Sequence, residues 1–379
     1  MKLTDICEFH GGSQPPKSEW SSEYKDGYIR MLQIRDFTQE GRVTPEYVKI
    51  SNRLRLCTED DILIGRYGAS VGKILSGKSG AYNVAIMKAV PDTSVVRKQY
   101  LRYYFLSPNF QNYILNLGGR AAQAGFSKDD LARLEITVVS LEEQDKIVNE
   151  LSTLEKTIST KQKQLKEFDD LVKSRFIEMF VEKGFKEITF SDYAEIIDGD
   201  RGKNYPKAEE FSDEGYCLFL SAKNVTKDGF LFEQMQFISE EKDNLLRKGK
   251  LCRGDIVITT RGTIGNIAFY DDDIPYDNVR INSGMVIIRQ KEVSFNQIFF
   301  LNAFKNKIDE IKETNVTGAA QPQLPIHIMS KIKLLNPPIE LQNEFADFVK
   351  LIDKSKFIVQ KQIDDLQELL DSKMDEYFG

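Results

Sequence analysis

Few residues of this sequence combine the type and the spacing that catalysis or metal binding requires. The two histidines, His10 and His327, have no metal-ligand partner at helical or hairpin spacing. The three aspartates at residues 271–273 could hold a divalent cation, but they occur once, between strand-like runs, which favours a solvated acidic turn. The phosphate-binding pattern GxxxxGK[ST] does not occur. These features favour a binding protein over an enzyme and predict no metal site.

One short motif does suggest an activity. Asn336-Pro337-Pro338 is similar to a motif of DNA methyltransferases that act on adenine N6 or cytosine N4. In that motif an aromatic residue follows the prolines, and its ring stacks on the flipped base while polar groups accept hydrogen bonds from the target amine. Here the fourth residue is Ile339, which has no ring. No glycine-rich turn of the kind that holds S-adenosylmethionine is expected either, because the glycines of GRYGASVG and TRGTIG lie inside β-type runs.

The composition is that of a soluble protein of two to four domains, with 379 residues of which 41% are hydrophobic and 29% charged. No apolar run is long enough to span a membrane, and the N-terminal segment lacks the core of a signal peptide. The four cysteines are scattered and form no CxxC pair. This usage indicates reduced thiols and predicts a cytoplasmic protein.

The net charge of −6 would be unusual for a protein that binds nucleic acid, but the charge is uneven. Residues 1–140 contain 19 basic and 15 acidic residues, a balance of +4. Residues 338–379 contain 5 basic and 10 acidic residues, a balance of −5. A basic face on the globular parts is therefore compatible with the composition.

The sequence is internally duplicated. GYIRMLQIRDFTQEG at residues 27–41 aligns with GYCLFLSAKNVTKDG at residues 215–229, and LCTEDDILIGRYGASVGKI aligns with LCRGDIVITTRGTIGNI. Further along, an offset of 198 residues pairs AAQ at 121–123 with AAQ at 319–321, Gln144 with Gln342, and Phe180 with Phe378. The two halves therefore have the same internal order.

Each half begins with a region whose short apolar runs, separated by glycine, predict a β-rich fold with helical stretches at residues 97–117 and 295–313. A segment of about 40 residues follows, with apolar side chains at spacings of three, four and seven. They are Leu151, Leu154, Ile158, Leu165, Phe168, Val172 and Met179 in the first half, and Val349, Ile352, Val359, Ile363, Leu366, Leu370 and Tyr377 in the second. This pattern predicts a helix about 55 to 60 Å long in each half. We expect the two helices to pair with each other, antiparallel if the halves are related by a pseudo-twofold axis.

The duplication also explains the methyltransferase-like motif. Residues 336–340 align with residues 138–142 of the first half, and both segments come just before a long helix. Proline in or before the first helical turn loses no hydrogen bond, and Ser140 is a suitable N-cap. The double proline is therefore interpreted as the start of a helix rather than as a catalytic motif.

A globular region, a long helix, a second such region and a second helix resemble the specificity subunit of type I restriction–modification systems. The resemblance covers essentially the whole chain. Its most specific elements are GDIVITTRGTIG at residues 254–265 and the passage GAAQPQLPIHIMSKIKLLNPPIELQNEF, in which Pro-Pro is followed by Glu-x-Gln at the start of the helix. The first half departs from this pattern, because Val139-Ser140 stands in place of Pro-Pro.

The resemblance implies an α+β fold with two β-rich target-recognition domains and two long helices that form an antiparallel coiled coil, as a pseudo-twofold repeat. The domains are expected at residues 1–140 and 184–337, a central spacer helix at 141–183 and a C-terminal spacer helix at 338–379. Each domain would read one half of a bipartite double-stranded DNA target. The helices would set the spacer and dock two modification subunits, which bind S-adenosylmethionine, and restriction subunits that use ATP and Mg²⁺ would join them. The chain itself would bind no cofactor and would not be an enzyme.

Candidate DNA-contacting residues lie in loops that combine glycine, basic and polar side chains. The first pair of loops spans residues 11–20 and 199–207, the second flanks the hairpin glycines, and the third is the turn before the amphipathic stretch. We select Ser13, Gln14, Lys17, Arg201, Lys203, Asn204 and Tyr205 from the first pair, Arg66, Tyr67, Arg261 and Thr263 from the second, and Arg120, Gln123, Thr317 and Gln321 from the third. The glycines Gly68 and Gly262 are expected to serve the backbone conformation.

Two other functions fit the same sequence. The chain could be a freestanding coiled-coil DNA-binding regulator, which would form homodimers and bind DNA tightly by itself. It could also be the specificity module of another methylation-coupled phage-defence system. The bases that are read do not follow from the sequence.

Overall fold

The computed structural model describes the whole chain except residues 40, 119–124, 263, 292–294, 316–323 and 325. The chain forms two compact units. Unit 1 contains Met1–Lys163 and Gln360–Gly379, and unit 2 contains Gln164–Val359. The long helices α6 (Leu141–Phe176) and α11 (Ile339–Phe378) each contribute one part to unit 1 and one part to unit 2.

Unit 1 contains two sheets, with strand orders β1-β9-β6-β7 and β2-β4-β3-β8-β5. Its strands are β1 (Cys7–Gly11), β2 (Trp20–Ser21), β3 (Tyr28–Leu32), β4 (Tyr47–Lys49), β5 (Leu56–Cys57), β6 (Ile62–Gly65), β7 (Ile74–Leu75), β8 (Gly80–Tyr82) and β9 (Ile86–Pro91). Its short helices are α1 (Leu3–Ile6), α2 (Ile34–Thr38), α3 (Lys98–Leu106), α4 (Pro108–Gly118) and α5 (Lys128–Leu131). The strand pairs are antiparallel except β3 with β8, which run parallel.

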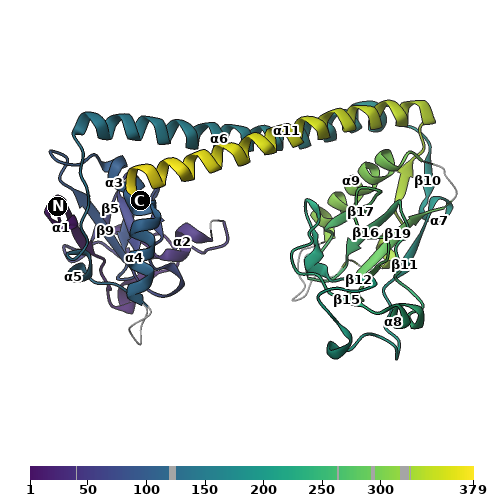
Figure 1. Cartoon of the computed structure of the whole chain (residues 1–379), viewed down its shortest axis with the longest axis horizontal. Coiled ribbons are helices and arrows are strands. Elements are labelled where there is room, and N and C mark those ends of the chain that lie inside the picture. The colour runs from purple at the N-terminus through teal and green to yellow at the C-terminus, as the bar shows by residue number, and fades with distance from the viewer. Residues whose placement is uncertain (40, 119–124, 263, 292–294, 316–323, 325) are drawn as a thin grey trace. The chain divides into compact units, whose positions relative to one another are not determined.

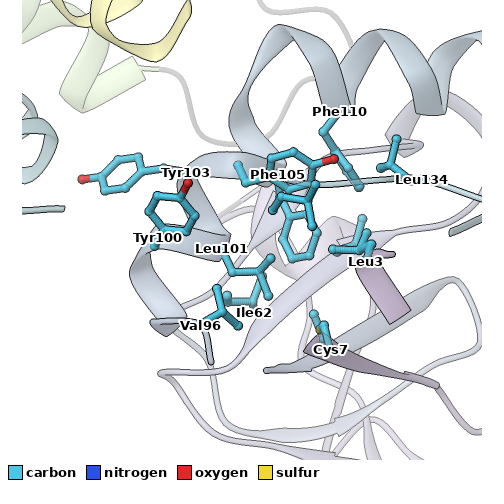
Figure 2. Close-up of a cluster of buried hydrophobic side chains, with 14 of the residues drawn as sticks. Leu3, Cys7, Ile62, Val96, Tyr100, Leu101, Tyr103, Phe105, Phe110 and Leu134 are labelled. Atoms are coloured by element: carbon cyan, nitrogen blue, oxygen red, sulfur yellow. The ribbon is translucent and has the colours of Figure 1, made fainter. Parts of the chain in front are cut away.

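Strand β6 shows why the apolar runs fold in this way. All four of its residues are buried. Because alternate residues of a strand point to opposite faces, Ile62 and Ile64 join the core under α3 and α4, while Leu63 joins the cluster between the two sheets. Figure 2 shows the first of these cores, in which Phe105 and Phe110 from the helices meet Leu3 and Ile62. A central strand that is covered on both faces therefore has a continuous run of apolar residues in its sequence rather than an alternating pattern.

Unit 2 repeats this arrangement, with sheets β11-β19-β16-β17 and β15-β12-β18. Its strands are β10 (Glu187–Thr189), β11 (Ala194–Asp198), β12 (Cys217–Leu220), β13 (Val225–Thr226), β14 (Gly229–Phe230), β15 (Phe237–Ile238), β16 (Asp255–Thr259), β17 (Ile267–Tyr270), β18 (Val279–Ile281), β19 (Met285–Gln290) and β20 (Lys333–Leu335). Its short helices are α7 (Phe190–Tyr193), α8 (Glu240–Leu245) and α10 (Ile326–Met329), and α9 (Gln297–Asn315) covers the sheet. Strands β12 and β18 run parallel, as β3 and β8 do. The predicted internal repeat is therefore confirmed.

The helical seam predicted from the sequence is buried or half-buried along its whole length. In unit 1 the Lys161 Nζ donates to Gln362 at 2.7 Å, and the Tyr377 hydroxyl donates to Glu150 at 2.6 Å. As one residue number rises, its partner's number falls, so α6 and α11 are antiparallel there (Figure 1). In unit 2 Asp169 pairs with Lys356, and Arg175 pairs with Glu344 at 3.2 Å, so the residue numbers of the two helices again run in opposite directions. The antiparallel helix pair is confirmed within each unit.

Both long helices begin where the sequence predicted. Helix α11 starts at Ile339, directly after Pro338, which confirms that the double proline marks a helix start. Helix α6 starts at Leu141, and the Ser140 hydroxyl accepts the Glu143 N–H at 3.2 Å, as an N-cap does. The C-terminal end of α6 continues into a π-helical turn, Ile177–Val181. The helical stretch expected at 97–117 is two helices, because the residue before Pro108 leaves the helical conformation.

The glycines of the two hairpins are placed differently from the prediction. They were expected inside β-type runs, but Gly68, Gly72, Gly262 and Gly265 lie in the connections between β6 and β7 and between β16 and β17. Their φ angles of +63°, +78°, +76° and +71° lie in the left-handed region, where a side chain would be strained. The expectation that Gly68 and Gly262 serve the backbone conformation is confirmed.

Candidate nucleic-acid interface

The loops that follow the first strand of each repeat are anchored by the same close backbone approach. A Cβ atom on Gly12 would lie 2.0 Å from the carbonyl oxygen of Asn83, and one on Gly199 would lie 2.2 Å from that of Asn282. No side chain fits at such a distance, so glycine is required at both positions. The loops of residues 11–20 and 199–207 therefore leave their sheets at equivalent points.

A polar side chain just after each glycine then fixes a second loop. The Ser13 hydroxyl accepts the backbone N–H of Arg55 at 3.2 Å. In unit 2 the Asp200 carboxylate accepts the backbone N–H of Arg247 at 2.8 Å. Both arginine side chains belong to exposed residues. Neither Arg55 nor Arg247 is among the residues selected from the sequence, because they lie 42 and 47 residues beyond their partners.

The pKa of Asp200 is held below its ordinary value. The cause is hydrogen bonding from the backbone N–H of Gly202, with further N–H groups from Arg247 and Lys248. An ionised carboxylate that accepts several backbone N–H groups holds the backbone segments that donate to it firmly in place. It orders the start of the loop of residues 199–207 while leaving the basic side chains beyond it exposed.

The side chains predicted to contact DNA differ in their surroundings. Gln14, Lys17, Arg201, Lys203 and Arg261 are exposed. The Arg201 guanidinium also donates to Asp198 at 3.1 Å and to the carbonyl of Ser283 at 3.2 Å, so it is oriented.

Asn204 and Tyr205 are partly buried. The Asn204 amide donates to the carbonyl of Leu245 at 3.1 Å. The ring of Tyr205 packs edge-on against Phe219, with centroids 5.7 Å apart, in a cluster under the loop. These contacts give both residues a supporting position within the loop of residues 199–207.

In unit 1 the hairpin turn between β6 and β7 lies against the loop of residues 11–20. It also lies against Phe126, which follows the predicted turn that contains Arg120 and Gln123. The Arg66 guanidinium lies 5.0 Å from the ring centroid of Tyr67 and reaches the carbonyl of Phe126 at 3.4 Å. A Cβ on Gly11 would lie 3.3 Å from the Arg66 Nη1. Tyr67 is 42% exposed, so its ring offers a flat apolar face to solvent.

In unit 2 the equivalent elements also meet. The backbone N–H and the hydroxyl of Thr260 donate to the carbonyl of Gly284, at 2.9 and 3.0 Å. The neighbouring carbonyl, that of Ser283, accepts the Arg201 guanidinium. The loop of residues 199–207 and the hairpin turn that carries Arg261 are thus joined through the segment between β18 and β19.

Five predicted site residues, namely Arg120, Gln123, Thr263, Thr317 and Gln321, lie outside the described residues. Among the residues that the structure does describe, no three His, Cys, Asp and Glu side chains gather as metal ligands. Over the same described ranges, no helix is long and apolar enough to cross a membrane. The three aspartates at 271–273 form a turn after β17, and the side chain of Asp272 is 98% exposed, which confirms the solvated acidic turn.

The structure thus contains two repeats of one α+β unit, and each repeat carries an anchored polar loop beside a glycine hairpin turn. The family model of the type I restriction modification DNA specificity domain matches residues 1–168 and again residues 182–368. The chain therefore belongs to this family and carries two copies of its domain.

Known proteins with similar sequences agree with this family. The chain is 24% identical to the type I restriction enzyme MjaVIII specificity subunit of Methanocaldococcus jannaschii, over 97% of this chain and 89% of that protein. It is also 24% identical to the MjaIX specificity subunit of the same organism, over 98% of this chain and 90% of that protein. The resemblance drawn from the sequence is confirmed.

Solved structures share the fold. The S subunit of a type I restriction–modification system from M. genitalium aligns with a TM-score of 0.51 at 18% identity, over 100% of this chain and 95% of that one. A chain from a study of complex assembly and conformational transition of the type I R-M system aligns with a TM-score of 0.60 at 14% identity, over 100% and 96%. At these identities the likeness concerns the fold alone.

Proposed function

We propose that this chain is the DNA-specificity subunit of a type I restriction–modification complex, and that each unit reads one half of a bipartite target. The observation that carries the proposal is the duplicated anchor. Gly12 against Asn83 and Gly199 against Asn282 start two polar loops at equivalent points of two equivalent units. A protein that reads two half-sites needs two such surfaces, and membership of the specificity-domain family supports this use of them.

Within each surface we assign different roles to different side chains. Lys17, Arg55, Lys203 and Arg247 are exposed and basic, which suits contacts to phosphates that position the protein. Arg66 and Arg261, beside the hairpin glycines, suit contacts to base edges, where arginine binds guanine with two hydrogen bonds. Tyr205 and Asn204 support their loop from beneath, as their packing and hydrogen bonding indicate. Ser13 and Asp200 fix the loops that carry Arg55 and Arg247 by accepting the backbone N–H groups of these two residues.

The partners follow from the same proposal. The outer surfaces of α6 and α11 dock two modification subunits, and restriction subunits join this core. S-adenosylmethionine and ATP with Mg²⁺ then belong to the partners, and methyl transfer is delegated to them. Asn336-Pro337-Pro338 lies directly before α11, where these residues form the start of the helix. This structural role of the methyltransferase-like motif supports the assignment of methyl transfer to the partners. We expect calorimetry to detect no S-adenosylmethionine binding by the purified chain, and stoichiometric binding would contradict the proposal.

The test uses the full chain co-expressed with modification subunits, with the methylated motif read from genomic DNA. Arg66→Ala should relax one or more positions in one half of the motif and leave the other half unchanged, and Arg261→Ala should do the converse. Losing one two-bonded base contact costs roughly 1 to 3 kcal/mol of discrimination. Lys166→Ala, an exposed position on α6, is the matched control and should leave the motif unchanged. A motif altered in both halves by either arginine variant would contradict separate reading.

The same material separates the proposal from a freestanding regulator. A regulator would form homodimers and bind one DNA sequence tightly without modification subunits. The proposed subunit becomes sequence-specific when the modification subunits are present. Gel-shift titration of the chain with and without them distinguishes the two.

A further inference from the structure

Unit 1 contains a groove of about 400 Å³ between α3 and α4 on one side and the paired long helices on the other. Its floor is formed by Tyr103, Leu106 and Met374, and its rim by Glu155, Asp371 and Asp375. Figure 2 shows the ring of Tyr103 at the edge of the core, pointing away from Phe105 and Phe110. Leu106 is 37% exposed there. The groove is therefore apolar at its base and acidic at its edge.

The acidic rim is only partly neutralised. Glu155 accepts the Tyr103 hydroxyl at 2.8 Å and lies 3.5 Å from the Arg102 guanidinium. Asp371 accepts a neutral amide, that of Gln367, at 2.9 Å. Within the part of the chain that the structure describes, the Asp375 carboxylate makes no hydrogen bond or ion pair. The rim thus offers two carboxylates to a cation.

The equivalent position of unit 2 differs in charge. Matching ring pairs establish the equivalence: Tyr100 lies 5.0 Å from Phe378 in unit 1, and Phe299 lies 4.8 Å from Phe180 in unit 2. In this register Leu106 corresponds to Lys305 and Asp371 corresponds to Lys173. An apolar floor residue and an acidic rim residue of unit 1 are therefore both lysines in unit 2.

Lys305 is an exposed residue of unit 2, and its ammonium group has charged neighbours of both signs. The pKa of Lys305 is below its ordinary value, first because of desolvation and then because of the nearby Lys356, while Asp353 and Asp169 oppose the shift. Lys356 itself pairs with Asp169. This position of unit 2 therefore combines lysines with aspartates, and the lysines would oppose the approach of a cationic side chain.

We infer that the unit 1 groove binds a basic amphipathic segment of a modification subunit, and that unit 2 has no such site. The inference rests on the proposed function, which makes the long helices the docking surface. Lysine and arginine side chains lay their aliphatic stems on apolar surface and keep the charge at the edge. Such side chains would cover Leu106 and Met374 and reach Asp371 and Asp375. Two identical modification subunits would then dock on this chain with unequal affinity.

The experiment titrates the full chain with its modification subunit and measures the stoichiometry by native mass spectrometry. Wild-type chain should bind two modification subunits. The Asp371→Asn/Asp375→Asn variant should bind one of them about tenfold more weakly, as expected for two exposed ion pairs, and the other normally. Leu106→Lys, which places the unit 2 residue in unit 1, should have the same effect through a different side chain.

The matched control is Asp365→Asn/Glu376→Gln, which removes the same charge from exposed positions of α11 that do not line the groove. It should leave both affinities within about twofold of wild type. Equal weakening by the control, equal weakening of both docking steps, or no effect of either groove variant would overturn the inference. If wild-type chain binds no modification subunit at all, the proposed function fails together with it. If wild type assembles but the groove variants behave like wild type, only the groove assignment fails.

Discussion

The carboxylate of Asp243 is one of two charges of unit 2 that are almost fully enclosed among the described residues, with 1% of the residue exposed. It pairs with Lys250 at 2.5 Å and with the buried guanidinium of Arg280. Burial alone would raise the pKa of Asp243, but hydrogen bonds from Lys250 and Arg280 outweigh burial and hold this pKa below its ordinary value. The pair connects α8 to β18, next to the strands that carry the loop anchors.

Asp243→Asn should destabilise unit 2 by about 3 kcal/mol, because it leaves the Arg280 charge buried without its partner. Asp228→Asn, at an exposed turn, is the matched control and should change stability by less than about 0.5 kcal/mol. Because the folded-state pKa of Asp243 is depressed, its contribution is present above the unfolded pKa near 3.9 and is lost as the pH falls through the lower folded value. Urea unfolding at pH 7 and at pH 3 measures both effects, and equal losses for the two variants at pH 7 would contradict this account.

The burial of the cysteine thiols leads to a second prediction at the scale of single residues. Cys7, Cys57 and Cys217 are buried, and desolvation raises their pKa to about 12, 11 and 12. Only Cys252 is exposed. Thiol reactivity requires the thiolate and access to it. A thiol-specific chromogenic reagent at neutral pH should therefore modify one cysteine of the folded chain and four in denaturant, and Cys252→Ser should abolish the reaction of the folded chain.

The anchored loops could be located from the sequence, because glycine and basic residues repeat at matched positions. Exposed side chains could not be separated from supporting ones in the same way. Tyr205 looks like a recognition aromatic in the sequence, but its ring packs against Phe219 on a strand beneath the loop. Arg55 and Arg247 were missed because their position depends on hydrogen bonds to Ser13 and Asp200, which are contacts between distant loops.

At the scale of elements, the start of each long helix is fixed to its own unit by a buried glutamine. Gln144 is 0% exposed and Gln342 is 1% exposed. The Gln144 Oε1 accepts the Arg97 N–H at 2.7 Å, and the Gln342 Oε1 accepts the Asn296 N–H at 2.9 Å. The two amides thus hold α6 against α3, and α11 against α9. This explains the Glu-x-Gln pattern as a structural contact.

Gln144→Ala should destabilise unit 1 by roughly 1 to 3 kcal/mol, because it leaves a backbone N–H and two carbonyl groups without their partner. Gln342→Ala should do the same to unit 2. Hydrogen exchange read by mass spectrometry can assign the loss to one unit. Gln162→Ala, exposed on α6, is the control and should leave the exchange of both units unchanged. If either the Gln144→Ala or the Gln342→Ala variant lost protection from hydrogen exchange equally in both units, the result would argue against local anchoring.

The helix pair also predicts how the spacer is set. Four extra residues lengthen a helix by about 6 Å and rotate the residues beyond the insertion by about 40°. Matched insertions after Gln164 and Gln362 should therefore lengthen the target's spacer by one or two base pairs, at about 3.4 Å each. A single insertion should misalign the seam and reduce activity instead. The methylated motif is read from genomic DNA, and an unchanged spacer with full activity in the doubly extended chain would show that the helices do not set it.

The elements themselves were largely predictable. The heptad-like seam, the two helix starts and the β-rich character of each half follow from periodicity and from the duplication. The break at Ser107 and the turn position of Gly68 and Gly262 did not, because both depend on local backbone conformation. Sheet order was beyond the sequence, since the parallel pairing of β3 with β8 joins residues that are far apart in the chain.

At the scale of the whole molecule, the repeat predicts that each DNA-recognition domain can be exchanged independently of the other. Replacing residues 1–140 or 184–337 with the corresponding domain of another family member should change one half of the methylated motif and preserve the other. The junctions are placed near Leu141 or Lys183, at the two ends of the α6 segment. A chain carrying its own domain re-inserted with the same junctions serves as the control. Methylomes in which a single exchange changes both halves would count against independent domains.

The composition of unit 1 has a consequence for biosynthesis. Its core includes Met374 and Phe378 beside Tyr100 and Leu151, although Gln360 follows Lys163 by 197 residues. A ribosome makes the N-terminal part of unit 1 first but supplies the rest only after all of unit 2. Until then the seam of α6 in unit 1 remains uncovered, an exposed apolar surface of the kind that chaperones bind and that promotes aggregation. The part of this chain that is made first is therefore the part that finishes folding last.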